Sequence, residues 1–210
     1  MIPPETMSIF LIASVALALA PGPDNIFVLT QSALFGRPAG LLVTLGLCTG
    51  LLVHTAAVTL GVAAIVQASA FAFAFNALKA VGAGYLLYLA WLAWRASATS
   101  ISTPRGAQRS SRSLYLRGVV MNVTNPKVAI FFLAFLPQFA DPARGALTQQ
   151  LLTLGALFML ATLCVFGAIA WTAGFIGEWL KGSARAQVAM NRIAAAVFVT
   201  LAIRLALSER

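Results

Sequence analysis

Charge is scarce in this sequence, and its scarcity excludes a soluble protein. Only 9% of the 210 residues are Asp, Glu, Lys or Arg, whereas 60% are hydrophobic and the mean hydropathy is +0.92. Soluble domains carry about 25% charged residues, so the composition predicts an integral membrane protein. The bases behind the net charge of +9 lie mostly outside the apolar segments. We interpret them as a topology signal and expect no nucleic-acid partner.

Cysteine and histidine are also rare, with two and one copies. Cys48 and Cys164 lie far apart without metal-ligand spacing, so we expect no metal site and no disulfide framework, and we expect both to pack in the core. The sequence has no nucleophile–base pair, no phosphate-binding glycine loop and no HExxH helix, so we expect neither an enzyme nor a cofactor. The first apolar stretch lacks a basic region and a cleavage site, which favours a mature membrane segment over a signal peptide.

Six apolar runs are long enough to cross a bilayer. They cover about 7–31, 40–66, 71–94, 114–140, 146–174 and 189–207. A polar, Ser-rich and basic stretch separates the third run from the fourth. The predicted fold is therefore an all-α integral membrane protein with a first three-helix repeat at 1–95, a cytoplasmic linker at 96–113 and a second three-helix repeat at 114–210.

The first and fourth runs are interrupted near their middles. The first contains Pro-Gly-Pro-Asp-Asn at 21–25 and the fourth contains Asn-Pro-Lys at 125–127. A shift of 103 residues superposes Pro23-Asp24 on Pro126-Lys127. Because each half has an odd number of spans, the two halves must insert in opposite directions. This pattern predicts an inverted repeat, in which two broken helices meet near the bilayer midplane and form a substrate site.

The breaks predict a pocket with a charge preference. Proline lacks an N–H donor and glycine permits unusual backbone angles, so we expect the first helix to stop near Ala20 and to restart at Asp24 or Asn25. The restarted helices at Asn25 and Asn125 would receive a carboxylate, while Asp24 would hold a cationic group, and together they fit a zwitterion. The alternative is a buried Asp24–Lys127 ion pair without a ligand, although charges at the bilayer centre cost about 3 kcal/mol or more and are usually functional.

These expectations define the candidate residues. The candidate substrate-binding residues are Asp24, Asn25, Asn125 and Lys127, and the candidate helix-breaking residues are Pro21, Gly22, Pro23 and Pro126.

His54, the only histidine, shares one helix face with Gly46 and Gly50, at spacings of four. The glycines would let another helix approach closely and would place His54 in the interior. Histidine ordinarily titrates near neutral pH, which suits a proton carrier, but a packed histidine bonded to a neighbouring backbone is an equal alternative. Asp24 is the leading candidate proton carrier, because a proton and a substrate would compete for one carboxylate.

The basic residues predict the orientation of the chain. Nine of them fall in the first, third and fifth connections and three on the opposite side. By the positive-inside rule, the odd connections lie in the cytoplasm and both termini lie outside.

Four stretches resemble one transporter family: PGPDN at 21, GLCTGLLVH at 46, LKAVGAGYLLYLAW at 78 and RGVVMNVTNPKVAIFFLAFLPQF at 117. They are similar to the lysine-exporter (LysE) superfamily, in particular to its branch named for resistance to homoserine and threonine. The resemblance covers nearly the whole chain.

The resemblance implies a multi-pass protein of the bacterial inner membrane that exports small amino acids, threonine- or homoserine-like, neutral or basic, by proton antiport. The expected partners are the amino-acid substrate, protons and membrane lipid, and a homodimer is left open. A cation or metal-ion exporter or channel of the same architecture is the alternative function.

Overall fold

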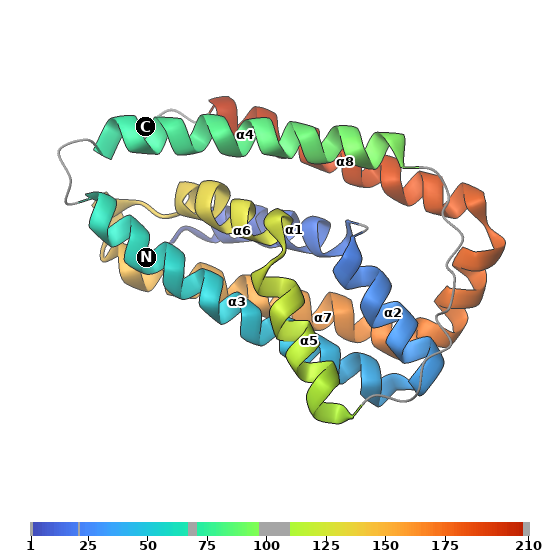
Figure 1. Ribbon diagram of the computed structural model, residues 1–210. Helices are drawn as coiled ribbons and strands as arrows, with labels where there is room; N and C mark the ends of the chain where they lie inside the picture. The colour runs from blue at the N-terminus through green and yellow to red at the C-terminus, as the bar shows by residue number, and fades with distance from the viewer. Residues whose placement is uncertain (1, 21, 67–70, 97–109, 208–210) are drawn as a thin grey trace.

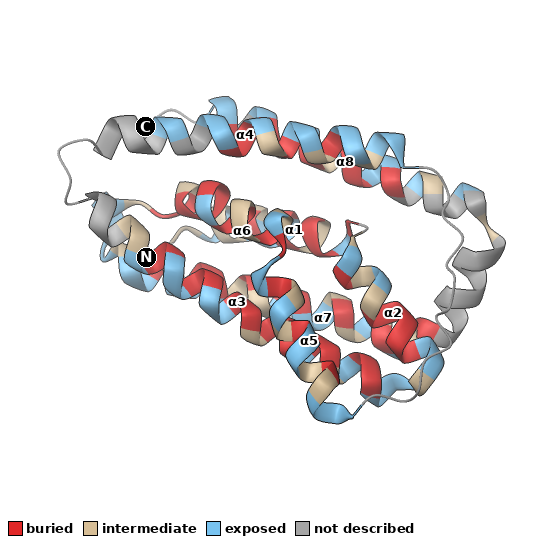
Figure 2. Ribbon diagram, in the orientation of Figure 1, coloured by how far each residue is buried: buried red, intermediate tan, exposed pale blue. Residues whose placement is uncertain are grey.

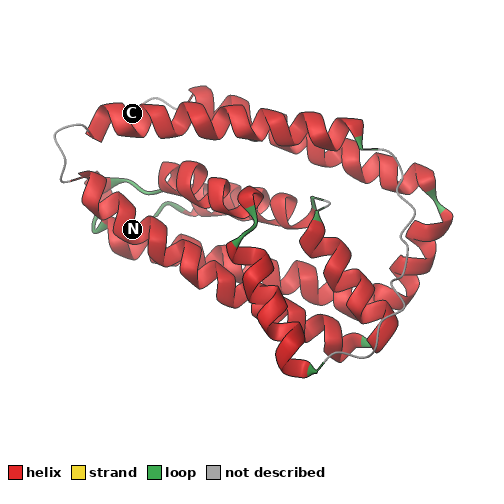
Figure 3. Ribbon diagram, in the orientation of Figure 1, coloured by secondary structure: helices red, strands yellow, loops and turns green. Residues whose placement is uncertain are grey.

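The computed structural model describes residues 2–20, 22–66, 71–96 and 110–207, with the side chains at 63–66, 71–75, 78–79, 174–182, 184, 186–187, 190 and 204 excepted (Figure 1). Pro21 and most of the predicted linker lie outside these residues. Within the described part of the chain every regular element is helical, joined by short turns (Figure 3). The all-α prediction is confirmed.

The described helices follow one another along the chain in the predicted order. They are α1 (Pro4–Leu19), α2 (Pro23–Phe35), α3 (Arg37–Val66), α4 (Phe71–Arg95), α5 (Ser111–Val123), α6 (Pro126–Ile130), α7 (Leu147–Gly182) and α8 (Ala184–Leu207). A π-helical turn, η1 (Phe131–Phe135), and two 3-10 turns, η2 (Leu136–Phe139) and η3 (Pro142–Arg144), connect α6 to α7.

Among the residues that the structure describes, two helices are long and apolar enough to cross a membrane alone. These stretches are Arg37–Val62 in α3 and Leu147–Ala173 in α7, with mean hydropathies of 2.0 and 2.3. Among the described residues the number of spans rises to four when each bent pair, α1 with α2 and α5 with the segment after it, counts as one span. Helices α4 and α8, of 25 and 24 residues, stand where the third and sixth spans are expected. The count of six stays a prediction.

Helices α1 and α6 lie at the centre of the molecule, between the α4–α8 pair and the group formed by α3 and α7 (Figure 1). Each belongs to one of the two interrupted segments. The other parts of these segments, α2 and α5, both pack against α3. The two broken segments therefore meet inside the bundle.

Helices α3 and α5 run parallel at very close range. A Cβ atom on Gly46 would overlap the carbonyl oxygen of Tyr115, and one on Gly50 would lie 2.6 Å from Cβ of Asn122. The close approach predicted from the glycine spacing is confirmed, because these positions have no room for a side chain.

Helices α3 and α7 run antiparallel. A Cβ atom on Gly40, near the start of α3, would lie 3.0 Å from Cβ of Ala170, which is far along α7. Further along α3, the hydroxyl oxygen of Thr55 would lie 2.6 Å from a Cβ atom on Gly155, near the start of α7.

Two further pairs of neighbouring helices run in opposite directions. Helix α2 turns into α3 at Gly36, whose φ of +85° favours glycine, and Ser32 then faces Gly40 across the turn. At the far end of α4, the Asn191 side chain near the start of α8 donates a hydrogen bond of 3.1 Å to the carbonyl oxygen of Ala96.

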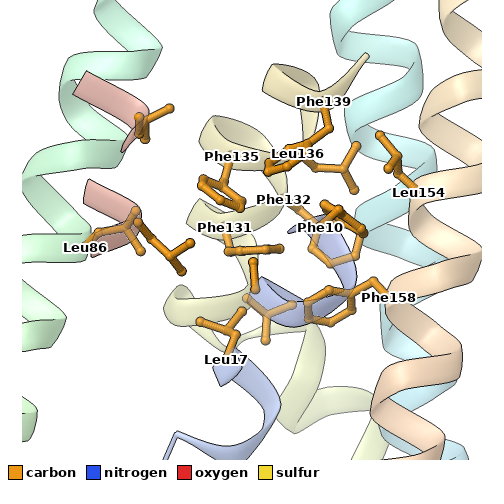
Figure 4. Packing of buried hydrophobic residues seen from close by; sticks show 14 of the residues in the cluster. Phe10, Leu17, Leu86, Phe131, Phe132, Phe135, Leu136, Phe139, Leu154 and Phe158 are labelled. Carbon is orange, nitrogen blue, oxygen red and sulfur yellow. The ribbon is translucent and has the colours of Figure 1, made fainter. Parts of the chain in front are cut away.

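The main core is aromatic and surrounds η1, directly after α6 (Figure 4). Phe131 and Phe135 have ring centroids 4.7 Å apart, and Phe10 of α1 lies 5.1 Å from Phe139. Many residues of the outer helices are exposed (Figure 2). Large apolar side chains are among them, as at Leu60 of α3, which is 72% exposed. An apolar exterior around an apolar core is the arrangement that a bilayer stabilises.

The two cysteines differ in their surroundings. Cys48 is buried as predicted, but Cys164 is exposed on α7, so the prediction of a second core cysteine was wrong. In a bilayer a small apolar side chain gains little by facing inward, because lipid is as apolar as the protein core.

Candidate functional site

Both predicted helix breaks are present. Helix α1 ends at Leu19 and α2 begins at Pro23, with a bend of 62°, while α5 ends at Val123 and the segment from Pro126 departs at 49°. Helix α2 begins at Pro23, so the predicted start at Asp24 or Asn25 was one or two residues too late. Proline suits the first position of a helix because the N–H group that it lacks would have no partner there.

Asp24 lies at the meeting point of the two breaks. Its side chain is only 3% exposed, and its Oδ2 atom accepts a hydrogen bond of 2.8 Å from Nδ2 of Asn125. The other carboxylate oxygen, Oδ1, is buried without a hydrogen-bond partner. Asp24 therefore joins the first half of the chain to the second and keeps one oxygen free for a further donor.

Asn125 uses both ends of its amide group. It is the N-cap residue of α6, and its Oδ1 atom accepts a hydrogen bond of 3.0 Å from the backbone N–H of Lys127. Its Nδ2 atom donates to Asp24. In this conformation the amino end of α6 is closed by its own cap.

Lys127 reaches across to the carboxyl end of α1. Its ammonium group donates to the carbonyl oxygens of Leu17 at 3.3 Å and Ala20 at 3.1 Å. A cation in this place stabilises the negative end of the helix dipole. A Cβ atom on Gly22 would lie 3.3 Å from Nζ, so glycine leaves room for the ammonium group.

Asp24 and Lys127 therefore do not form the ion pair that the sequence left open. In the described structure each makes its hydrogen bonds with another group, Asp24 with the Asn125 amide and Lys127 with the carbonyl oxygens of α1. Both charged groups are held at the break by separate partners.

Asn25 also turns back toward α1. Its Nδ2 atom donates a hydrogen bond of 2.7 Å to the carbonyl oxygen of Ala18, and its Oδ1 atom is buried without a partner. The N-cap position of α2 is Gly22, which supplies no side-chain cap. Among the described residues no side chain caps the amino end of α2, which is therefore open, whereas Asn125 closes that of α6.

His54 lies beside the second break and not beside Asp24. Its Nε2 atom is 3.1 Å from the carbonyl oxygen of Asn122, which can only accept, so Nε2 carries a hydrogen. The backbone N–H of Asn125 donates to the same carbonyl at 3.0 Å. The ring packs 5.7 Å from that of Phe132. These contacts agree with the alternative in which His54 is packed and bonded to a neighbouring backbone group.

The sequence-based prediction missed Asn122. Its side chain is 2% exposed, faces Gly50, and has a buried Oδ1 atom without a partner. An amide inside an apolar segment is itself a signal of an internal polar contact, and it lies three residues before Asn125. As for metals, no group of three His, Cys, Asp or Glu side chains comes together among the described residues.

Comparisons with known proteins converge on one family. The family model described as LysE type translocator matches residues 15–209. A homoserine/homoserine lactone efflux protein of Salmonella typhimurium (strain LT2) is 34% identical over 198 residues, 94% of this chain and 94% of that protein.

Two further relatives are named only as membrane proteins. An uncharacterized membrane protein of Vibrio cholerae is 30% identical over 200 residues, 95% of this chain and 96% of that protein. The uncharacterized membrane protein YrhP of Bacillus subtilis is 26% identical over 204 residues, 91% and 94% of the two chains. No solved structure matches this chain significantly.

Proposed function

The chain belongs to the LysE type translocator family, and from this premise we propose that it exports small amino acids through a binding site at the two helix breaks. It is a multi-pass protein of the bacterial inner membrane, in keeping with its apolar helices and with relatives named as membrane proteins. The efflux protein of Salmonella typhimurium supports an amino-acid substrate. The observation that carries the proposal is the buried Asp24 carboxylate with one unpartnered oxygen.

The free Oδ1 atom of Asp24 is the proposed partner of the substrate's ammonium group. A buried polar atom without a hydrogen bond is costly, and a charged group inside a membrane is usually functional. An ammonium group placed there would satisfy the oxygen and the charge together.

The substrate's carboxylate is proposed to bind at the open amino end of α2. The first N–H groups of a helix have no partner inside it, and Gly22 supplies no cap for those of Asp24 and Asn25. These N–H groups and the positive end of the helix dipole attract an anion. The Lys127 ammonium group, close to Gly22, adds a positive charge.

The proposed substrates are threonine- or homoserine-like amino acids, neutral or basic. The groups at the break match the α-ammonium and α-carboxylate groups that all amino acids share. In the proposed site Asn125 positions Asp24 through a hydrogen bond and caps α6. No contact among the described residues favours the alternative of a cation or metal-ion exporter.

Proton antiport is the proposed energy source. A proton and the substrate's ammonium group would compete for the same oxygen of Asp24, so that binding one releases the other. His54 is the second candidate for the proton. Its bond to the Asn122 carbonyl gives it a role in packing at the break of α5, which favours Asp24 as the carrier.

The directions of the helices support an inverted repeat. Helix α2 runs opposite to α3, whereas α5 runs parallel to α3. Helix α5, in the first segment of the second half, therefore runs opposite to α2, in the first segment of the first half. The two counterparts α3 and α7 are antiparallel, as a two-fold axis in the membrane plane requires. In both halves a proline begins the helix after the break.

The test is export from cells loaded with candidate amino acids, comparing overexpression with a deletion strain. Asp24→Asn keeps the side-chain shape but removes the charge, and export should fall by more than about tenfold with unchanged protein in the membrane. Glu5→Gln, which removes an exposed carboxylate at the start of α1, is the matched control and should export normally. Wild-type export by Asp24→Asn would refute the proposed site.

A further inference from the structure

One acceptor and one donor at the first break have no role in the contacts described so far. The Oδ1 atom of Asn25 is buried and has no hydrogen-bond partner among the described residues. The Lys127 ammonium group has three N–H donors, and in the described structure two of them bind the carbonyl oxygens of Leu17 and Ala20. An amide oxygen and an ammonium N–H are therefore both available for a further group.

Both atoms lie beside the same empty space at Gly22. A Cβ atom on this residue would lie 3.3 Å from Nζ of Lys127 and 3.8 Å from Oδ1 of Asn25. The backbone at Gly22 does not require glycine, because its φ of −167° is extended. What glycine provides here is the absence of a side chain, which leaves room next to the two polar atoms.

A hydroxyl group matches this pair of atoms. It has one donor and can also accept, so it can donate to Oδ1 of Asn25 and accept from Nζ of Lys127 at the same time. A methyl group in the same place can do neither, and it would keep water from both polar atoms at a cost in free energy. The space beside Gly22 therefore favours a small group that is both a donor and an acceptor.

This space adjoins the proposed site of the substrate's α-groups. Gly22 is the N-cap residue of α2, and the substrate's carboxylate is proposed to bind the N–H groups of Asp24 and Asn25 directly after it. The unpartnered Asp24 oxygen that is proposed to bind the ammonium group belongs to the same turn. A short side chain on an amino acid held in this way can reach the space.

We propose that the space beside Gly22 binds the side-chain hydroxyl group of the substrate, which donates to Asn25 Oδ1 and accepts from Lys127 Nζ. The inference rests on the proposed function, because it needs an amino acid bound at the break. It makes Asn25 a residue that determines specificity for hydroxylated amino acids. A site that hydrogen-bonds a hydroxyl group rejects analogues without one, because its own polar groups are then left unpaired.

The test is transport by the purified full-length protein in proteoliposomes, corrected for the leak of empty liposomes. Homoserine is compared with norvaline, and threonine with valine, because each pair differs only by a hydroxyl group in place of a methyl group. Wild type should favour the hydroxylated member at least about tenfold in kcat/KM, the usual effect of a hydrogen bond to a charged group. Equal values for the two members would overturn the proposal and indicate a water molecule in the space.

Two substitutions at Asn25 separate its acceptor from its donor. Asn25→Leu removes both, whereas Asn25→Asp keeps an oxygen and loses only the donor to the Ala18 carbonyl. The preference for the hydroxylated member should disappear in Asn25→Leu and persist in Asn25→Asp. An equal loss in both variants would assign the effect to the bond with Ala18 and overturn the proposal.

Gly22→Ala tests the space itself with both polar groups intact. The added Cβ atom occupies the room beside them, so the preference should fall about tenfold. Gly61→Ala is the matched control and should keep the wild-type preference, because a Cβ atom on Gly61 of α3 would contact no neighbouring group within 4 Å in the described part of the structure. A wild-type preference in Gly22→Ala would contradict the proposed subsite. Gel filtration and circular dichroism establish that each variant is folded.

Asp24→Asn distinguishes a failure of this inference from a failure of the proposed function. If Asp24→Asn transports neither member of a pair while wild type transports both equally, the site at the break stands and only the hydroxyl subsite is refuted. If Asp24→Asn transports both members at wild-type rates, the proposed site is refuted and the subsite with it.

Discussion

At the scale of single residues, Asn125 is the link between the two halves of the chain. Its amide oxygen caps α6 while its amide nitrogen holds the Asp24 carboxylate, 101 residues earlier in the sequence. Both functions need an amide, because a carboxylate has no donor and an ammonium group has no acceptor. The residue type at this position therefore controls the geometry of the proposed site.

Asn125→Asp should abolish export and destabilise the protein. The cap oxygen stays, but the donor to Asp24 is replaced by a second carboxylate, and the lost hydrogen bond to a charged group costs about 1.5–3 kcal/mol. Thermal unfolding in detergent and export from loaded cells measure the two effects.

The exchange of both residues, Asp24→Asn with Asn125→Asp, is the control for this prediction. It restores one carboxylate and one amide across the same contact, so the unfolding temperature should recover. Export should stay low, because the charge then lies on the wrong helix. Full export by the exchanged variant would show that the position of the carboxylate is unimportant.

His54→Gln should preserve proton-coupled exchange in proteoliposomes with an imposed pH gradient. Glutamine retains a donor for the Asn122 carbonyl but cannot carry a proton near neutral pH. His54→Leu, which loses the donor, should lower thermal stability by about 1–3 kcal/mol because the carbonyl at the break loses a partner. If His54→Gln supports only downhill, uncoupled flux, the proton carrier is His54 and not Asp24.

At the scale of elements, the contact between α3 and α5 holds the second break in place. Gly46 and Gly118 face each other so closely that a Cβ atom on either would overlap a backbone carbonyl of the other helix. Asn122, one turn further along α5, lies against Gly50 and offers its carbonyl to His54. The small residues therefore determine how near the broken segment comes to α3.

Gly46→Ala should destabilise the protein by about 1–3 kcal/mol, the usual cost of overpacking. Chemical unfolding in mixed micelles gives this difference. Gly84→Ala is the matched control, because a Cβ atom on Gly84 of α4 would meet no other packed group within 4 Å among the described residues, and alanine favours helix. Equal stability of the two variants would mean that α3 and α5 can separate without cost.

At the scale of the whole molecule, the six segments are expected to alternate in direction across the membrane. The antiparallel and parallel contacts of α3 with α7 and α5 agree with this alternation. The distribution of basic residues predicts which side of the membrane each connection occupies. The two kinds of observation are independent, since one concerns packing and the other concerns insertion.

Reporter fusions should therefore give opposite results at two positions. A phosphatase and a fluorescent protein inserted within 100–112 should report the cytoplasm, and the same pair fused after Arg210 should report the outside. The same side for both fusions would contradict an odd number of spans between the linker and the carboxyl terminus, and with it the inverted repeat.

The sequence by itself determined the class of the protein, the family resemblance and the two interrupted segments. These are local or compositional properties: long apolar runs form helices in a bilayer, and proline interrupts a helix anywhere beyond its first turn. Asp24 could be singled out for the same reason, because a carboxylate in such a run is unusual whatever surrounds it.

Only the tertiary structure decided which partner each polar group of the break takes. Lys127 binds the carbonyl groups of α1 and not Asp24, Asn25 turns back to Ala18, and His54 bonds to the second break. These choices depend on how closely helices from the two halves approach one another. That distance is set by packing between residues up to 110 positions apart, which no local pattern encodes.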